Sequence, residues 1–293
     1  MTTKRIGSAL LLLALTAGGA IAGTPAIPSK DAPRPFIFGV VPQFEPRRLH
    51  DAWQPILAEL EERSGRRLEF TTTLTIPDFE KELAAGHYDF VYANPFQILS
   101  EIGRQQYEPL VRDAAPLRGI LVVRKDSPLR EPADLAGKVV AMPSPNALGA
   151  SLLIRADLER IHHATVKPLY VKTHGSVYLH VAKGLADAGG GVEKTLQEQD
   201  AAVRDLLQVI YTTRSMPSHP VATHPRVPQA DREAVRRAFL ELAGTAQGME
   251  LLARVPMKQV TSTSMADYRE LLQWGLRAYW ESGREEDRSP PSR

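Results

Sequence analysis

Three short segments of the 293-residue sequence place polar or small residues between a predicted strand and a predicted helix. They are residues 89–96, 142–151 and 171–178. Their candidate binding residues are Tyr92 and Asn94 in the first, Ser144, Asn146 and Ser151 in the second, and His174 and Ser176 in the third. The first turn of a helix has backbone N–H groups without intrahelical partners, so each segment offers donors to an anion.

Each segment also has a purely structural interpretation, which the sequence leaves open. Pro95 suits the first turn of a helix capped by Asn94, with Tyr92 in the core. The second segment can be a proline-stiffened turn before a helix, although its small residues would also let a ligand approach the backbone. His174 can equally be structural. The three glycines at 189–191 indicate tight packing, a bulge, or backbone contact with a bound molecule.

The composition excludes several classes of chemistry. The chain has 36 Lys and Arg, 34 Asp and Glu, a formal charge of +2 and no cysteine. The lack of cysteine excludes disulfides, thiolate metal sites, iron–sulfur clusters and thiol nucleophiles. Without residues 1–22, whose only charged residues are Lys4 and Arg5, 34 basic and 34 acidic residues remain. Because a neutral chain lacks a general attraction to nucleic acid or anionic lipid, we expect no nucleic-acid partner.

Residues 1–22 have the three parts of a secretory signal peptide. After a basic start, residues 6–15 are an apolar run, and Ala20 and Ala22 are small residues at the cleavage positions. The run is shorter than the roughly 20 residues of a membrane span, which disfavours an anchor. Since no cysteine follows it, a lipid anchor is excluded. We therefore expect a soluble protein of the periplasm.

Hydrophobic periodicity predicts alternating strands and helices along the rest of the chain. Trp53, Ile56 and Leu60, for example, share one face of a predicted helix. The predicted strands cover residues 36–41, 68–75, 88–92, 117–124, 139–142, 166–171, 187–192 and 207–213. The predicted helices cover residues 49–64, 78–85, 95–106, 146–160, 176–183 and, as a helical pattern, 229–280. This alternation indicates parallel sheets with helices on both faces.

Two pauses in the pattern predict an α/β protein of two lobes. One follows Arg124, and the other, residues 214–228, contains four prolines. The predicted division is a signal peptide at residues 1–22, a first lobe at 36–124 plus 213–281, a second lobe at 125–212, and a disordered tail at 282–293. Two chain crossings between the lobes would form a hinge with a ligand cleft beneath it.

Several short motifs follow one another between residues 36 and 260. They are Asp89, Tyr92, Asn94 and Pro95; Asp-Leu-Ala-Gly-Lys at 134–138; Pro145 and Asn146; Thr173 and His174; Val-Ala-Lys-Gly at 181–184; and Met-Pro-Ser-His-Pro at 216–220. Their order and spacing resemble the phosphate/phosphite/phosphonate family of substrate-binding proteins of ABC importers. The resemblance implies the type II periplasmic-binding-protein fold, with two α/β lobes, a hinge and an interlobe cleft. It also implies an oxyanion held by hydroxyls, helix-start amides and a histidine, and a membrane permease as partner.

The resemblance extends unevenly to the site. His174 falls on the family's ligand histidine, Glu193 falls near its acidic cleft position, and the Tyr92 segment matches in shape. The candidate ligand-binding residues are therefore Tyr92, Asn94, Ser144, Asn146, Ser151, His174, Ser176, Glu193 and His219. If protonated His174 or His219 holds the anion, the affinity should fall as pH rises through roughly 6–8. No metal and no cofactor is expected.

Two departures from the family pattern bear on the ligand. The hydroxyl cluster after Asn146 is replaced by Ala-Leu-Gly-Ala at residues 147–150, with Ser151 displaced. His219 stands where the aminophosphonate pattern has an acid. These changes disfavour an aminophosphonate, and they favour a different small anion or a larger ligand with an apolar part against Leu148.

Other function classes have weaker support. An enzyme is disfavoured because Gly-x-Ser-x-Gly, a phosphate-binding Gly-Lys-Ser/Thr and His-Glu-x-x-His are all absent. A zinc-binding importer component has enough histidines, but the adjacent His162 and His163 would point apart. The same fold could instead act as a ligand sensor for a two-component kinase, which the sequence does not separate from import. We expect a monomer.

Overall fold

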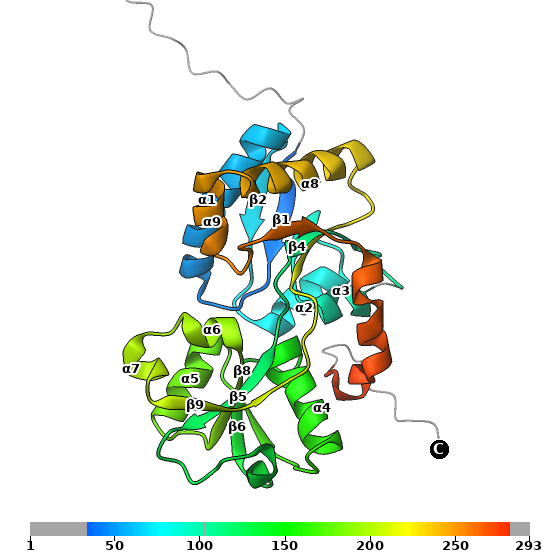
Figure 1. Ribbon diagram of the computed structural model, residues 1–293. Coiled ribbons are helices and arrows are strands. Elements are labelled where there is room, and N and C mark those ends of the chain that lie inside the picture. The colour runs from blue at the N-terminus through cyan, green and yellow to red at the C-terminus, as the bar shows by residue number, and fades with distance from the viewer. Residues whose placement is uncertain (1–33, 102, 282–293) are drawn as a thin grey trace, which may run out of the picture. The chain divides into compact units, whose positions relative to one another are not determined.

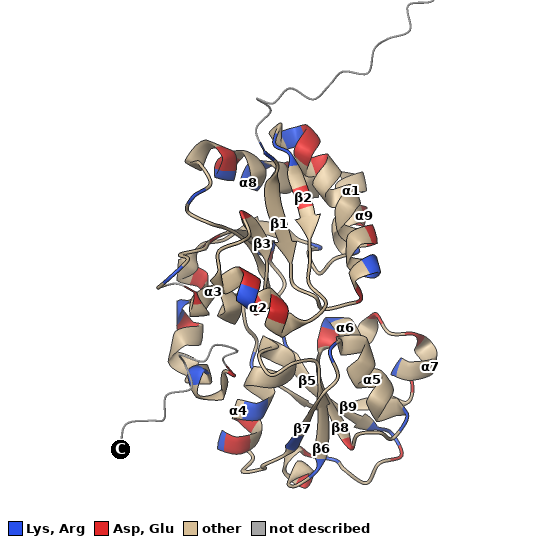
Figure 2. Cartoon of the chain, turned by 180° about the vertical axis from the view of Figure 1, so that it is seen from behind, with Lys and Arg blue, Asp and Glu red and all other residues tan. Residues whose placement is uncertain are grey.

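The computed structural model describes residues 34–101 and 103–281. The predicted signal peptide, residues 1–22, and the predicted tail, residues 282–293, lie outside these residues. In the described part of the chain, the strands form two sheets, each with its own helices (Figure 1). Most charged residues lie on helices and loops rather than on the strands (Figure 2). None of the helices in this part combines the length and apolarity of a membrane span.

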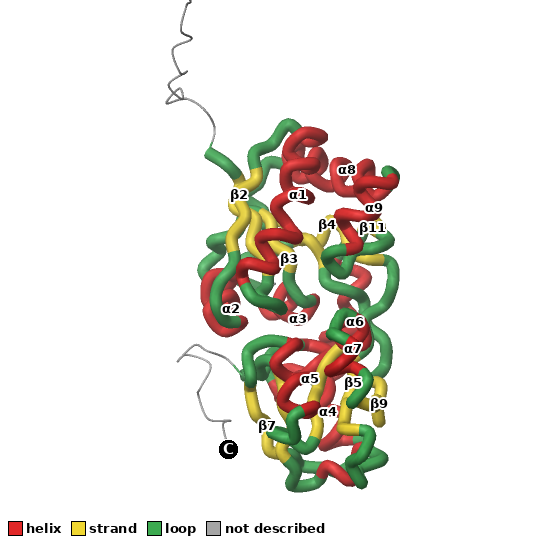
Figure 3. Tube along the Cα trace, turned by 90° about the vertical axis from the view of Figure 1, so that its left-hand side faces the viewer, coloured by secondary structure: helices red, strands yellow, loops and turns green. Residues whose placement is uncertain are grey.

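The sheet of the first lobe contains both parallel and antiparallel neighbours. Its spatial order is β11 (Val260–Ser262), β4 (Glu108–Asp113), β10 (Pro220–Thr223), β3 (Phe90–Tyr92), β1 (Phe36–Val40) and β2 (Leu68–Thr71). Its helices are α1 (Pro46–Ser64), α2 (Ile76–Ala84), α3 (Pro95–Ser100), α8 (Gln229–Ala243) and α9 (Ala246–Ala253). Helices α1, α8 and α9 pack together beside the sheet (Figures 1 and 3). The Phe38 and Trp53 rings, 5.4 Å apart, join the sheet to α1.

The sheet of the second lobe is also mixed. Its spatial order is β7 (Lys167–Tyr170), β6 (Val139–Met142), β8 (Ala188–Val192), β5 (Gly119–Arg124) and β9 (Leu207–Thr212). Its helical segments are η1 (Pro132–Leu135, 3-10), η2 (Leu148–Leu152, π), α4 (Leu153–Arg160), α5 (His174–Ala182), α6 (Glu193–Gln197) and α7 (Ala201–Arg204). Strand β8 lies in the middle of the sheet, so its carboxyl end delivers α6 to the face between the lobes.

The two crossings between the lobes are paired with each other. The backbone N–H of Leu117 donates to the Met216 carbonyl at 2.8 Å, and the N–H of Met216 donates back at 2.9 Å. This short antiparallel bridge ties the two crossings to each other at the position where the sequence predicts a hinge. The C-terminal 3-10 segments, η3 (Met265–Trp274) and η4 (Leu276–Tyr279), then run past α3 to α4 (Figure 1).

The structure corrects one lobe boundary. Strand β5, at the end of the predicted first lobe, pairs with β8 and β9 in the second sheet. The pause after Arg124 is a surface turn of the second lobe, where the N–H of Lys125 donates to the Leu206 carbonyl. The first crossing therefore precedes Gly119. The rest of the predicted division stays a prediction.

The expectation of parallel sheets was wrong in part, because each sheet combines parallel with antiparallel pairs. In the second sheet the predicted strand β5 pairs antiparallel with β8 and β9, and in the first sheet three strands escaped the sequence patterns. Strands β4, β10 and β11 all pair antiparallel in the first sheet. Strand β4 has few apolar residues, β10 begins at Pro220, which suits the first position of a strand, and β11 has only 3 residues. Two helices also begin two residues earlier than predicted, since Thr75 caps α2 and Thr173 caps α5.

Candidate functional site

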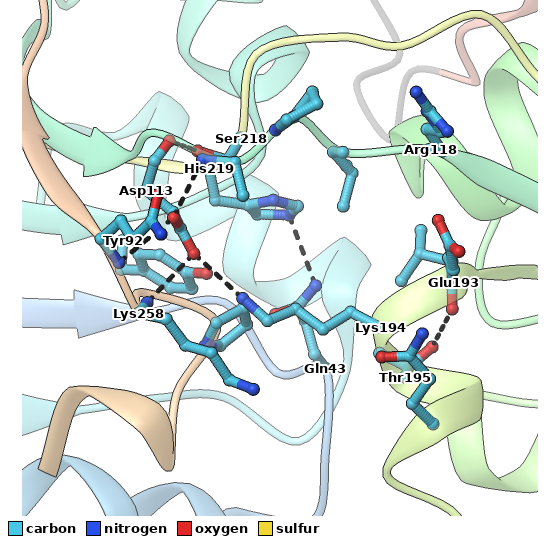
Figure 4. Close-up of a pocket in the computed structure, with 17 residues that line it drawn as sticks. Gln43, Tyr92, Asp113, Arg118, Glu193, Lys194, Thr195, Ser218, His219 and Lys258 are labelled. Carbon is cyan, nitrogen blue, oxygen red and sulfur yellow. Dashed lines mark hydrogen bonds and ion pairs between the residues drawn. The ribbon is translucent and has the colours of Figure 1, made fainter. Parts of the chain in front are cut away.

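A cavity of about 330 Å³ lies between the lobes, beside the two crossings and the start of α6 (Figure 4). Separate stretches of the chain form its wall. The lining residues that carry polar or charged side chains are Gln43, Tyr92, Asp113, Arg118, Glu193, Lys194, Thr195, Gln197, Ser218, His219, Lys258 and Gln259. Three of the predicted site residues, Tyr92, Glu193 and His219, are among them.

Asp113, the last residue of β4, organises one wall of this cavity. Its side chain is only 2% exposed. One carboxylate oxygen accepts hydrogen bonds from the backbone N–H groups of Ala115 (3.0 Å) and Gln259 (3.3 Å). The other accepts from the N–H of Lys258 (3.0 Å) and from the Nζ of Lys194 (3.0 Å). Four donors and an opposite charge compensate the burial of this carboxylate.

The cavity is lined by more basic than acidic side chains. Lys194, Arg118 and Lys258 face two carboxylates, Asp113 and Glu193. Lys194 is paired with Asp113, whereas the exposed Arg118 and Lys258 side chains form no hydrogen bond or ion pair with another described residue. Both charges can contact an anionic ligand, and that of Lys258 also acts on the Glu198 carboxyl group, where it opposes the larger, pKa-raising effect of burial.

Tyr92 and His219 form an aromatic wall at the inner end of the cavity. Their ring centroids are 5.5 Å apart and the planes are inclined by 28°. The Nε2 atoms of His219 and Gln43 are 3.4 Å apart, an arrangement in which the amide donates to an unprotonated ring nitrogen. Burial raises the pKa of the Tyr92 hydroxyl well above its usual range, so this wall carries no negative charge.

A second pocket, of about 20 Å³, lies behind this wall. It shares Gln43, Leu117, Val192 and His219 with the larger cavity. Four helical segments begin at it: α2 at Ile76, α3 after Asn94, η2 after Ala147, and α5 at His174. The three predicted segments thus converge, but on a space that holds about one water-sized group.

Two predicted asparagines are engaged in structural hydrogen bonds. Asn94 caps α3 by accepting from the Gln97 N–H at 2.9 Å, and its Nδ2 donates to the Asn146 carbonyl at 3.3 Å. The Asn146 Nδ2 donates to Glu80 at 2.8 Å and to the Glu281 carbonyl at 2.9 Å. Asn146 lines neither pocket; it joins α2 of the first lobe to the last described residue.

The three predicted serines also lie outside both pockets. Ser151 donates to the Met142 sulfur at 3.1 Å, inside the second lobe. Ser176 completes the cap of α5 with Thr173, its N–H donating to the threonine hydroxyl at 3.2 Å. Ser144 is buried, with no partner for its hydroxyl in the described part of the chain. The second segment thus brings no side-chain hydroxyl to the pocket that its residues 147–150 line.

Burial removes the charge from both site histidines. It lowers the pKa of His174 to about 4, and that of His219 to about 3 with a smaller contribution from His174 and Lys194. Both rings are therefore neutral near pH 7 in the ligand-free cleft, contrary to the expectation that an imidazolium supplies the positive charge. Within residues 34–101 and 103–281, no three His, Asp or Glu side chains group as a metal ion would require.

The basic residues of the cavity and Asp113 were missed in the sequence. Asp113 ends a strand that the patterns did not predict, and Arg118, Lys194 and Lys258 are isolated charges without a motif. Among these four residues, only Lys194 could have been proposed as a site residue from the sequence, because it directly follows the Gly-rich strand and the candidate residue Glu193. The other three meet only through the fold.

Comparison with known proteins agrees with this architecture. Residues 38–268 match the family of periplasmic substrate-binding proteins of phosphonate ABC transporters. The chain belongs to this family. It therefore serves an importer as a substrate-binding protein of the periplasm, and the family consists of transport proteins rather than enzymes.

Solved structures share the type II periplasmic-binding-protein fold at low sequence identity. A binding component of a phosphonate ABC transporter from Pseudomonas aeruginosa has a TM-score of 0.72 and 15% identity, over 87% of this chain and 92% of that one. PhnD1 of Prochlorococcus marinus, in complex with methylphosphonate, has a TM-score of 0.74 and 11% identity, over 83% and 97%. A Xanthomonas citri protein bound to chloride has a TM-score of 0.69 and 16% identity, over 83% and 98%.

Proposed function

We propose that this importer protein binds a small anion with an organic part, such as a phosphonate, in the 330 Å³ cavity between its lobes. The observation that carries the proposal is the pair of basic side chains, Arg118 and Lys258, that line the cavity without a described partner of their own. A charge-assisted hydrogen bond in such a site contributes about 1.5–3 kcal/mol.

The volume of the cavity accommodates an anion with an organic part. Ligand sites of this kind begin at about 300 Å³, and the cavity reaches that size. The smaller pocket behind Gln43 and His219 has too little space for a phosphonate group in this arrangement of the lobes, and it lacks ionised side chains. The methylphosphonate bound by the Prochlorococcus marinus protein is a ligand of the proposed class.

Titration calorimetry with phosphate, phosphite, methylphosphonate and aminoethylphosphonate tests this assignment. Lys258→Met should weaken binding of the tightest anion about tenfold or more, since it removes one charge-assisted hydrogen bond. Lys125→Met is the matched control, because it removes the same charge from a surface turn and should leave affinity within about twofold. Equal affinities for both variants, or phosphate as the tightest ligand, would contradict the proposal. Aminoethylphosphonate as the tightest ligand would contradict only the narrower expectation that His219 disfavours an aminophosphonate.

We also propose that residues 1–22 direct export and are removed, which agrees with the periplasmic location of the family. The mature protein would then begin at Gly23 and carry equal numbers of basic and acidic residues. Intact-mass measurement of protein recovered from the periplasm tests this, and a retained Met1 would contradict it.

A further inference from the structure

Helix α6 carries two oppositely charged residues on the side that meets the first lobe. Lys194 is in its first turn and Glu198 follows its last residue, four positions later, so the two side chains lie on one face. The helix stands at the edge of the second lobe nearest α1 and α9 (Figures 1 and 2). Each of the two side chains forms an ion pair with a residue of the first lobe.

The first pair joins Lys194 to Asp113 across the cleft, with 3.0 Å between Nζ and Oδ2. The position of the Asp113 carboxylate does not depend on the lysine, because three backbone N–H groups of the first lobe also donate hydrogen bonds to it. One of these belongs to Lys258. Asp113 is therefore a positioning residue that sets the location of both lysines of the cavity.

The second pair has the opposite polarity. The Arg48 guanidinium, from α1 of the first lobe, lies 3.0 Å from the Glu198 carboxylate of the second. It also stacks 3.8 Å from the centre of the Phe44 ring, which restricts its rotamers. Neither Arg48 nor Glu198 lines the 330 Å³ cavity, so this pair connects the lobes from outside the cavity. The Glu198 carboxyl group also interacts electrostatically with the cavity residues Lys194 and Lys258, so Arg48→Glu is the variant that leaves the charge next to these lysines unchanged.

We propose that α6 is an electrostatic clasp that closes the cleft before a ligand is bound. In one pair the second lobe supplies the positive residue, Lys194, and in the other it supplies the negative residue, Glu198. Opposite charges therefore meet in only one position of α6 against the first lobe, and a shifted position would bring like charges together. Ligand-free protein then populates the closed arrangement. Because apparent affinity scales with the fraction of protein in the binding-competent state, breaking the remote Arg48–Glu198 pair weakens anion binding. This last consequence rests on the proposed function; the closure itself does not.

Interlobe distance in the ligand-free protein tests the clasp. The chain has no cysteine, so cysteines introduced at the exposed positions Glu62 and Lys183, one in each lobe, accept spin labels uniquely. We expect one short distance for the parent protein, a longer or broader distribution for Arg48→Glu and for Glu198→Arg, and recovery in the double variant, whose charges are exchanged. Raising NaCl from 0.05 to 1 M should broaden the parent distribution, because screening weakens the more exposed Arg48–Glu198 pair.

The outcomes separate the clasp from the proposed ligand. The clasp would be overturned if the parent protein showed long interlobe distances and the single variants showed the same distribution. It would also be overturned if the double variant folded but kept long interlobe distances. Phosphate and methylphosphonate titrations should show a loss of about two- to fivefold in the single variants, with recovery in the double variant. If the double variant recovered the short interlobe distance but neither it nor the parent protein bound any tested anion, the clasp would be retained and the proposed ligand class rejected. If the single variants fail to fold, the salt series on the parent protein decides.

Discussion

At the scale of single residues, the neutral histidines change the expected pH dependence of binding. With pKa values lowered by burial to about 4 for His174 and about 3 for His219, neither ring titrates between pH 6 and 8 in the ligand-free cleft. For an anion whose own charge is constant in this range, the affinity should stay within about twofold. Calorimetry at several pH values measures this.

Comparison with His219→Gln completes that test. The variant retains a polar side chain but cannot titrate, so its pH profile should parallel that of the parent. A tenfold fall in parent affinity between pH 6 and 8, absent from the variant, would show that the ring is charged in the complex.

The same lowered pKa values mean that the unfolded chain binds more protons than the folded one below about pH 6.5, so stability should fall as pH decreases toward 4.

At the scale of elements, the three glycines of β8 serve close packing. A Cβ at Gly190 would lie 2.1 Å from the Ala150 carbonyl oxygen, and one at Gly191 would lie 2.2 Å from the Tyr178 hydroxyl. Strand β8 is central in its sheet, so the backbone of η2 can approach it only where side chains are missing. The structural interpretation of this glycine run therefore has direct support, since a Cβ at any of the three positions would meet a packed atom of the second lobe at less than 3 Å.

Gly190→Ala should consequently destabilise the protein. Overpacking against a backbone carbonyl costs about 1–3 kcal/mol. Gly175→Ala is the matched control, because its Cβ would meet its nearest neighbour, the Gln199 amide, at 3.6 Å, an ordinary contact. In helix α5 this change should leave stability unchanged or raise it by up to about 1 kcal/mol. Urea unfolding measures both, and equal stabilities of the two variants would count against the packing explanation.

At the scale of the whole molecule, the C-terminal segments join the two lobes through a shared apolar cluster. Tyr268, Leu271 and Leu276 pack with Phe96 and Leu99 of the first lobe, and with residues around η2 and α4 of the second. Polar contacts extend this connection, since Asn146 of the second lobe bonds both Glu80 and Glu281. Movement of the lobes must therefore pivot about this cluster as well as about the paired crossings.

Leu271→Ala should thus cost about 2–5 kcal/mol, the usual range for a buried leucine. Its neighbour Leu272 is 49% exposed, so Leu272→Ala should change stability by about 0.5 kcal/mol or less. Tryptophan fluorescence during urea unfolding reports on the first lobe through Trp53 and on the cluster between the lobes through Trp274. A small loss for Leu271→Ala would show that the segment is not part of the cooperative unit.

The sequence alone determined the alternating elements of the second lobe, most of the first, and the membership of a two-lobed binding-protein family. Periodicity and caps are local, so β6 was predicted with its observed bounds and Asn94 as the cap of α3. The same local signals located the start of α3 after Asn94, but they placed the other two starts at residues 146 and 176, where the structure has Leu148 and His174. They also located the glycine run, without deciding between its packing and ligand-contact interpretations.

Only the tertiary structure decided which side chains face the cavity. The cavity brings together three residues that are far apart in the chain: Asp113, Lys194 and Lys258. The local sequence around each of them would be the same if its side chain pointed to solvent. Strands β4 and β10 were missed for the same reason, because pairing with distant neighbours stabilises them more than their own composition does. The ionisation of His174 and His219 likewise depends on burial, which is a property of the assembled lobes and not of the loops that carry these residues.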